Sequence, residues 1–259
     1  MRERRLPDWN AFRQFAERTE LRNFAFRSQA DASWTLTPLL LRRLERLGTS
    51  ADEALSLEAS ALRRFKASAH RFIAPNEYRP DGSNAEWWAV MRHFGAPTRL
   101  LDWSLSIYVA AYFAASESPD SDGAIWLAHT STAMEKATEE GLDGWNSSAN
   151  GQNVWLSDAA SPPTLVFYER LTQSERMLAQ QGIFSICRNV LGNHGDLLDG
   201  VFSREEKTGG NFLKIVVPAE LKVVFMRRLI GMNITASALF PGLDGLGRAV
   251  DERVRLGLK

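Results

Sequence analysis

The sequence predicts an α+β fold, in which a helical N-terminal part packs on a mixed or antiparallel β core. The chain has 259 residues, 44% hydrophobic and 24% charged, as is usual for a globular protein. Apolar residues at helical spacing dominate the early part of the chain, and short strand-like runs gather later. Helices and strands in separate runs favour α+β over a doubly wound sheet. We expect a single domain over residues 1–259, with its core over about residues 20–250.

The N-terminal half is predicted to be mainly helical. Aromatic residues recur at helical spacing after Asp8, which we expect to cap the first helix. Phe24 and Phe26 alternate as in a strand, which turns Arg27 toward the opposite face. Asn84 is the expected cap of a later helix. The predicted helices are 8–19, 39–47, 51–74, 85–94 and 104–115, and the predicted strands are 23–28 and 97–103.

The C-terminal half supplies most of the predicted strands. The segment 130–160 is rich in Ser, Asn, Gly and acids, and we expect an irregular insertion there with one helical turn. The predicted strands are 124–128, 164–168, 182–187 and 212–217, and the predicted helices are 174–180, 219–230 and 242–256.

Composition points to a cytoplasmic protein. Cys187 is the single cysteine, which excludes an intrachain disulfide and fits a reducing compartment. The N-terminal Met-Arg-Glu-Arg-Arg is not followed by the apolar run of a signal peptide, and no apolar run approaches the length of a membrane helix. We therefore expect no membrane association.

The charge balance does not support a non-specific nucleic-acid binder. Lys and Arg number 31, as do Asp and Glu, so the formal net charge is zero. Residues 1–71 nevertheless hold 14 basic against 9 acidic residues, and residues 117–158 hold 1 against 8. The basic region could face phosphates or an acidic partner, and solvated helix faces are the alternative explanation.

Motifs for several reaction classes are missing. The four histidines show no metal-ligand spacing, so no metal site is predicted. The sequence also lacks a GxSxG nucleophile elbow, a P-loop and a GxGxxG loop. An enzyme of this sequence would use neither serine nucleophile chemistry of that type nor an obvious bound metal.

The stretch His93–Trp103 holds charged residues between two apolar helices. Arg99 and Asp102 flank two leucines, and burying such groups is costly unless they are paired or bound. Two interpretations stay open: the two residues pair as a buried strut, or Arg99 clamps a phosphate or carboxylate. Trp103 ends the strand next to Ser104 and could stack on a ligand ring.

Several blocks together resemble the FRG domain family, which is named for a Phe-Arg-Gly motif. Here that motif is Phe26-Arg27-Ser28, so a serine takes the place of the glycine. The other matching blocks are His93–Ser104, Ala110–Ala114, Arg176 with Gln180–Phe184, Ile215–Pro218, Lys222 and Leu239–Gly245. The resemblance spans roughly residues 20–250.

The arrangement is also similar to ADP-ribosyltransferases, which implies NAD as the bound substrate and no metal. Arg27 would hold the NAD phosphates, and Glu175 would be the catalytic carboxylate, with Glu169 and Asp102 as alternatives. Arg176 could instead occupy the position of the acid. The residues implied as catalytic are Glu175, Arg27 and Ser104, and those implied as cofactor-binding are Arg27, Ser28, Arg99, Asp102, Trp103, Ser104, Ser106 and Gln181.

Three hypotheses follow for function. The first is an NAD-dependent ADP-ribosyltransferase-like effector, a bacterial toxin or anti-phage defence protein that modifies a nucleic acid or protein and is paired with an antitoxin. The second is a non-catalytic FRG module that recognises a nucleotide, a nucleic acid or a protein. The third assigns Arg99 and Asp102 a purely structural role.

Overall fold

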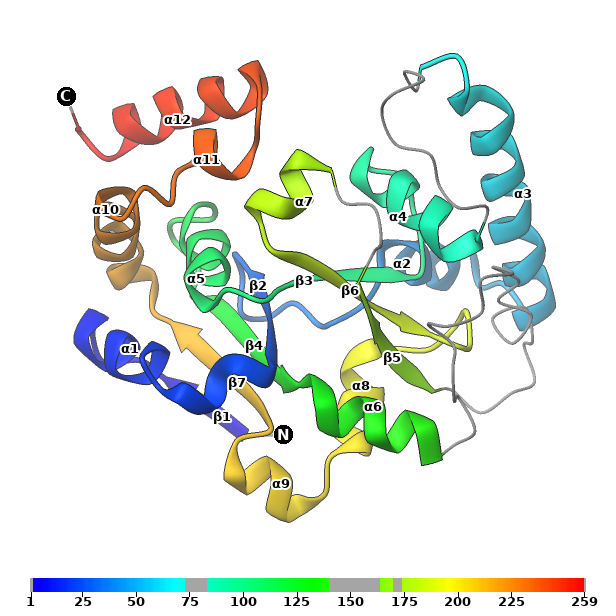
Figure 1. The fold of residues 1–259 in the computed structure, drawn as a ribbon, viewed down its shortest axis with the longest axis horizontal. Helices are drawn as coiled ribbons and strands as arrows, with labels where there is room; N and C mark the ends of the chain where they lie inside the picture. Colours follow the sequence, from blue (N-terminus) through cyan, green and yellow to red (C-terminus); the bar gives the residue numbers. More distant parts are fainter. Residues whose placement is uncertain (1, 73–82, 140–163, 170–173, 259) are drawn as a thin grey trace.

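A mixed β-sheet forms the centre of the protein (Figure 1). The computed structural model describes residues 2–72, 83–139, 164–169 and 174–258. The strands in them are β1 (Arg2–Arg5), β2 (Phe24–Gln29), β3 (Leu100–Ser104), β4 (Gly123–His129), β5 (Leu165–Tyr168), β6 (Gly182–Cys187) and β7 (Phe212–Val217). They lie in the order β1-β7-β4-β2-β3-β6-β5, with β1 and β7 parallel and the other neighbours antiparallel.

Each predicted helix has a counterpart in the structure. The helices that correspond to predicted segments are α1 (Trp9–Ala16), α2 (Leu39–Leu47), α3 (Ala51–Ala69), α4 (Asn84–His93), α5 (Ile107–Ala115), α7 (Glu175–Ala179), α10 (Lys222–Gly231) and α12 (Leu243–Arg255). Short 3-10 turns cover Thr19–Asn23 and Ala219–Leu221. The α+β class and the mixed sheet are therefore confirmed. The extent of the single domain stays a prediction.

The segment after β4 is the main correction to the predicted fold. Residues 130–160 were expected to be irregular with one helical turn, but α6 (Thr130–Glu139) is a regular helix of ten residues. Ala133 and Ala137, four residues apart, are buried and give it one apolar face, which is too narrow to stand out among polar neighbours. Residues 140–163 lie outside the described part of the chain.

In the described part of the chain, one strand and three short α-helices were not predicted: β1, α8 (His194–Val201), α9 (Arg204–Gly209) and α11 (Ala236–Leu239). The strand β1 consists of exposed charged residues at the edge of the sheet, so it shows no apolar alternation. The short helices depend on side-chain caps such as Asn193 and Ser203.

Helix boundaries also differ in detail from the predicted ones. Asp8 caps α1 as expected, but Ser83 rather than Asn84 caps α4. Ser106 caps α5, so that helix begins three residues later than predicted. Phe72 lies within the predicted helix 51–74, but in the structure it follows the end of α3 and is 86% exposed.

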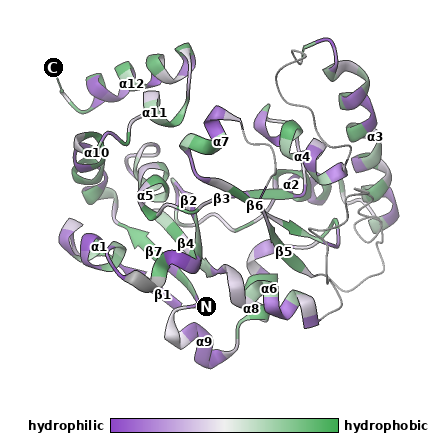
Figure 2. Cartoon of the chain, viewed as in Figure 1, coloured by the Kyte–Doolittle hydropathy of each residue, from purple (hydrophilic) through white to green (hydrophobic). Residues whose placement is uncertain are grey.

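Apolar clusters cover both faces of the sheet. Phe26, Ile125 and Ile215 pack with α1, α5 and α10 in one cluster. A second cluster joins β3, β5 and β6 to α3 and α4, and a third lies among β4, β5, β7, α6 and α8. Figure 2 shows hydrophobic colour along the central strands and hydrophilic colour over much of α9.

The sheet divides at its centre, and this division positions the site. The strands β2 and β3 are paired at a single position, Phe26 with Ser104, whereas β2 pairs with β4 along its whole length. Beyond that pair the two strands separate. The backbone groups that the two strands turn toward each other there do not pair across the gap, so side chains, water or a ligand must satisfy them.

Candidate functional site

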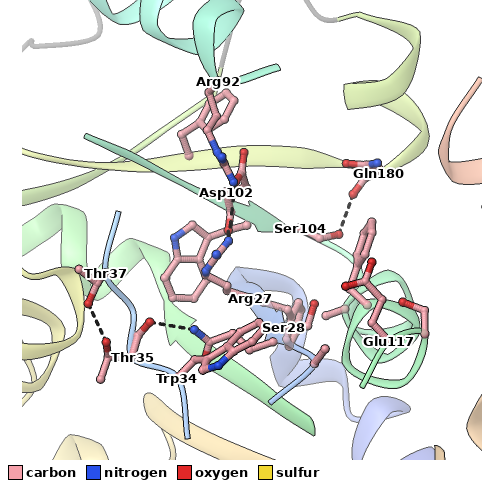
Figure 3. A pocket seen from close by; sticks show the side chains of 18 of the residues that line it. Arg27, Ser28, Trp34, Thr35, Thr37, Arg92, Asp102, Ser104, Glu117 and Gln180 are labelled. Atoms are coloured by element: carbon pink, nitrogen blue, oxygen red, sulfur yellow. Dashed lines mark hydrogen bonds and ion pairs between the residues drawn. The ribbon is translucent and has the colours of Figure 1, made fainter. Parts of the chain in front are cut away.

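A cavity of about 800 Å³ opens where β2 and β3 separate. This volume is within the usual range for small-molecule and cofactor sites. It is lined by residues of β2, the 30–37 loop, α2, α4, β3, α5 and α7: Phe26, Arg27, Ser28, Gln29, Ala30, Ser33, Trp34, Thr35, Thr37, Arg42, Arg92, His93, Gly95, Asp102, Trp103, Ser104, Ala110, Phe113, Ser116, Glu117, Arg176, Met177, Gln180 and Phe184. Figure 3 shows several of these side chains around the space.

Arg27 bridges the gap between the two strands. Its Nη1 donates a hydrogen bond of 2.7 Å to the backbone oxygen of Asp102 and lies 3.8 Å from the carboxylate of the same residue. Arg92 reaches that carboxylate from α4, with Nη2 2.6 Å and Nε 2.8 Å from Oδ2. Two guanidinium groups thus meet on one carboxylate (Figure 3).

The cluster shifts the pKa values of its members. Burial alone would raise the pKa of Asp102, but the attraction of Arg92 and Arg27 outweighs burial and lowers it. Burial is the main cause that lowers the pKa of Arg27 to about 10, and repulsion from Arg92 and Arg42 adds to it. Arg27 therefore stays cationic at neutral pH in a site where positive charge is already in excess.

We expect the stability contributed by Asp102 to disappear in acid. A carboxyl group whose pKa is lowered by folding stabilises the native state above its unfolded pKa of about 3.9, and this contribution is lost as pH falls through the lower native value. Urea unfolding at about pH 6 and pH 2.5 checks this: Asp102→Asn should be less stable than the wild type at the higher pH, and the gap should close at the lower. An equal gap at both pH values would contradict the assignment.

The cavity carries more positive than negative charge. Four arginines line it, Arg27, Arg42, Arg92 and Arg176, against the two acids Asp102 and Glu117. Burial also lowers the pKa of Arg42 and of Arg176. An anion in the cavity would reduce the mutual repulsion of these groups, so the electrostatics favour an anionic ligand.

The loop after β2 forms a second wall, with an aromatic surface. Trp34 is 51% exposed and lines the cavity. The loop is anchored by Gln29, whose side chain donates to the backbone oxygen of Thr35 at 2.8 Å and accepts from Trp126 Nε1 at 2.7 Å. A fixed loop that presents an accessible indole provides a stacking surface for a planar group.

The residues predicted at the end of β3 have different roles. Ser104 lines the cavity, with its hydroxyl donating to the backbone oxygen of Gln180 at 2.7 Å. Trp103 also lines it, but this residue is only 3% exposed, and its indole Nε1 donates to the hydroxyl of Ser185 at 2.8 Å. Ser106 caps α5 and is not among the lining residues.

Arg99 lies outside the cavity, and the predicted pair between Arg99 and Asp102 is wrong. Its buried guanidinium forms an ion pair with Glu58 of α3, with Nε 2.8 Å from Oε1. It also donates to the backbone oxygen of Arg188 at 2.8 Å and lies 4.9 Å from the ring centroid of Trp88. Arg99 therefore joins α3, α4 and the end of β6, away from Asp102.

The predicted catalytic glutamate is not brought to the cavity. Glu175 is exposed at the start of α7, and its neighbour Arg176 lines the cavity. Likewise Gln180 lines it, but Gln181 does not. Glu169 follows β5, is exposed and is also not among the lining residues. Among the proposed ligand contacts, the structure brings together Arg27, Ser28, Asp102, Trp103 and Ser104.

Three charged residues that line the cavity were not predicted from the sequence as site residues: Arg42, Arg92 and Glu117. The first two lie on α2 and α4, and their spacing is that of ordinary solvated helix faces. Glu117 follows the apolar helix α5 at the start of an acidic stretch that looks like a surface loop. No sequence pattern distinguishes these residues, because only the tertiary packing places them around one space.

The described residues contain no group of three or more His, Cys, Asp or Glu that could hold a metal ion. None of the helices in these parts of the chain is both long enough and apolar enough to span a bilayer.

Comparison with known proteins gives one match. No curated protein and no solved structure matches the chain. Residues 22–123 match the family model described as FRG domain. This region includes β2, β3 and α5, together with Arg27, Arg92, Asp102 and Glu117 of the cavity. Residues 22–123 of the chain are therefore similar to the FRG domain.

Proposed function

We propose that the cavity binds NAD and that the protein transfers ADP-ribose from it, as an effector active in a reducing, cytoplasmic compartment. The observation that carries this proposal is the convergence of four arginines and an accessible tryptophan on one cavity of about 800 Å³. A dinucleotide offers two phosphates to the arginines and planar rings to the aromatic surface.

The arginines suit a diphosphate because their positions are held before a ligand arrives. Asp102 fixes Arg27 and Arg92, since both guanidinium groups contact its carboxylate. Each guanidinium has five N–H donors and uses only some of them on Asp102, so others remain to bind phosphate oxygens. Such preorganisation reduces the entropy lost on binding.

We expect transfer activity to depend on Arg27. Incubation with NAD labelled in the adenylate part and with cell lysate should give labelled product and free nicotinamide, and Arg27→Ala should reduce both by at least about 100-fold. Arg228→Ala is the matched control, because Arg228 is exposed on α10 and outside the cavity lining. Equal activity in the wild type and Arg27→Ala would refute the assignment of the cavity.

A second candidate function is a non-catalytic nucleotide-binding module. The observation that favours it is the position of Glu175 outside the cavity, with Arg176 inside. This candidate predicts that NAD binds in an Arg27-dependent way but that no nicotinamide is released.

The effector role has its own test in cells. As a toxin or anti-phage protein, the wild type should arrest bacterial growth when expressed, and the Arg27→Ala variant at equal abundance should not. An antitoxin would be recognised by its ability to restore growth in the wild-type strain. Nucleic acid and protein isolated from the arrested cells would then be compared, and the target is the one that carries ADP-ribose.

A further inference from the structure

We propose that Glu117 is the carboxylate that promotes transfer from NAD to an oxygen nucleophile, and that a second cavity beside it holds that nucleophile. This inference rests on the proposed function and adds to it the acid that the sequence did not locate. Three observations support it: the position of Glu117 between two cavities, the availability of its carboxylate for a ligand, and the hydrogen bonds that hold its backbone.

Glu117 lines both the main cavity and a neighbouring one of about 340 Å³. The second cavity lies between α5 and α12, and its lining includes Phe113, Glu117, Phe240 and Arg248. Phe113 and Ser116 are also shared by the two cavities. A group at this junction can contact a donor on one side and an acceptor on the other.

The carboxylate of Glu117 is available, unlike the other acid of the main cavity. Asp102 is engaged by Arg27 and Arg92 and serves to hold them. Within the described residues, the side chain of Glu117 accepts no hydrogen bond and forms no ion pair of the kind that holds Asp102, and its charge acts on Lys222 only through a longer-range attraction. Figure 3 shows Glu117 beside α5, on a different side of the cavity from Arg92.

The main chain at Glu117 is held by a buried lysine. Lys222 is 2% exposed, and its Nζ donates to the backbone oxygens of Glu117 at 2.9 Å, Ser118 at 2.8 Å and Ala30 at 2.7 Å. Ser118 has a φ of 49°, in the left-handed region that serine rarely adopts. Since Ala30 and Glu117 both line the main cavity, Lys222 fixes two of its walls relative to each other.

The proposed transfer needs only two reactants, NAD and either water or an acceptor hydroxyl. The bond between ribose C1′ and the nicotinamide nitrogen breaks, and its electron pair leaves with neutral nicotinamide. The oxygen of water or of an acceptor hydroxyl forms the new bond to C1′, and its proton passes to Glu117 and then to solvent. The negative charge of Glu117 also stabilises the positive charge that develops on the ribose.

The second cavity has room for a side-chain-sized or base-sized acceptor group. Phe113 and Phe240 provide apolar walls, with ring centroids 5.8 Å apart. The guanidinium of Arg248 lies 4.6 Å from the Phe240 centroid, at the edge of this space. In the absence of an acceptor, water would occupy the cavity and NAD would be hydrolysed.

The experiment compares three glutamate-to-glutamine variants. Glu117→Gln should bind NAD within about threefold of the wild type but release nicotinamide at least about 100-fold more slowly. Glu175→Gln tests the acid implied by the family resemblance, and Glu205→Gln, an exposed position on α9, is the control. Thermal unfolding of all variants checks that they are folded.

Each outcome decides the inference. If the wild type releases nicotinamide and Glu117→Gln does so at the same rate, the inference is overturned and the proposed function stands. If only Glu175→Gln loses nicotinamide release, the inference is also overturned, and Glu175 is the catalytic carboxylate instead. Binding of NAD without release overturns the inference and favours the binding module. Failure of the wild type to bind NAD overturns the inference and the proposed function together.

Discussion

Replacement of Arg99 by methionine should destabilise the protein by about 3–5 kcal/mol, the usual result of breaking a buried ion pair on one side. The side chains of Arg99 and Glu58 are only 2% and 6% exposed. Without the guanidinium, the carboxylate of Glu58 would remain buried without its cationic partner. The backbone oxygens of Cys187 and Arg188 would also lose a donor. Urea or guanidinium unfolding measures the change.

A second variant shows whether the penalty comes from the unpaired charge. The double variant Glu58→Leu with Arg99→Met replaces both members by apolar groups of similar size, and it should recover much of the lost stability. Arg46→Met is the control, because Arg46 is exposed on α2. A change of less than about 0.5 kcal/mol for Arg99→Met would contradict the role of Arg99 as a structural brace.

Replacement of Lys222 by methionine should destabilise the protein by about 2–4 kcal/mol, because three backbone oxygens lose the same donor. Burial lowers the pKa of Lys222, against the attraction of Asp31, Asp122 and Glu117, so removal of its charge offsets part of this loss. The variant should also displace Glu117 and Ala30, which this lysine holds.

Two measurements separate the stability effect of Lys222 from its effect on the site. Denaturant unfolding gives the change in stability, with Arg228→Met on the exposed face of the same helix as control. Nicotinamide release, measured well below the unfolding temperature, should fall at least about tenfold. A folded Lys222→Met protein with wild-type stability and wild-type release would show that these hydrogen bonds do not hold the site.

Local patterns predicted much of the fold. Phe24 and Phe26 alternate with Arg27, and this alternation placed the strand and the opposite orientation of Arg27 correctly. Gly95, with a φ of 80°, follows α4 as a glycine after a helix should. The helix α6 was missed because its apolar face is only a few small residues wide, and β1 because its contacts lie with a strand about 200 residues away.

The site was harder to predict than the fold. A charged residue in an apolar stretch requires an explanation, and this reasoning singled out Asp102, whereas Arg27 and Ser104 were implied by the family resemblance. The same reasoning paired Arg99 with Asp102, because only neighbours along the strand are visible in the sequence. Its real partner, Glu58, is 41 residues away on α3, a helix that packs against α4. Arg92 and Glu117 are polar residues at helix ends, and only the division of the sheet gives them a shared role.

Calorimetric titration of ligands into the wild-type protein and Arg27→Ala tests the central claim, that the arginine-lined cavity is a dinucleotide site. NAD and ADP-ribose should bind the wild type at one site, with affinity that falls as salt increases. Adenosine, which lacks phosphates, should bind at least about 100-fold more weakly, and Arg27→Ala should weaken NAD binding to a similar degree. Adenosine binding as tightly as NAD, or NAD binding that is unchanged in Arg27→Ala, would contradict the account.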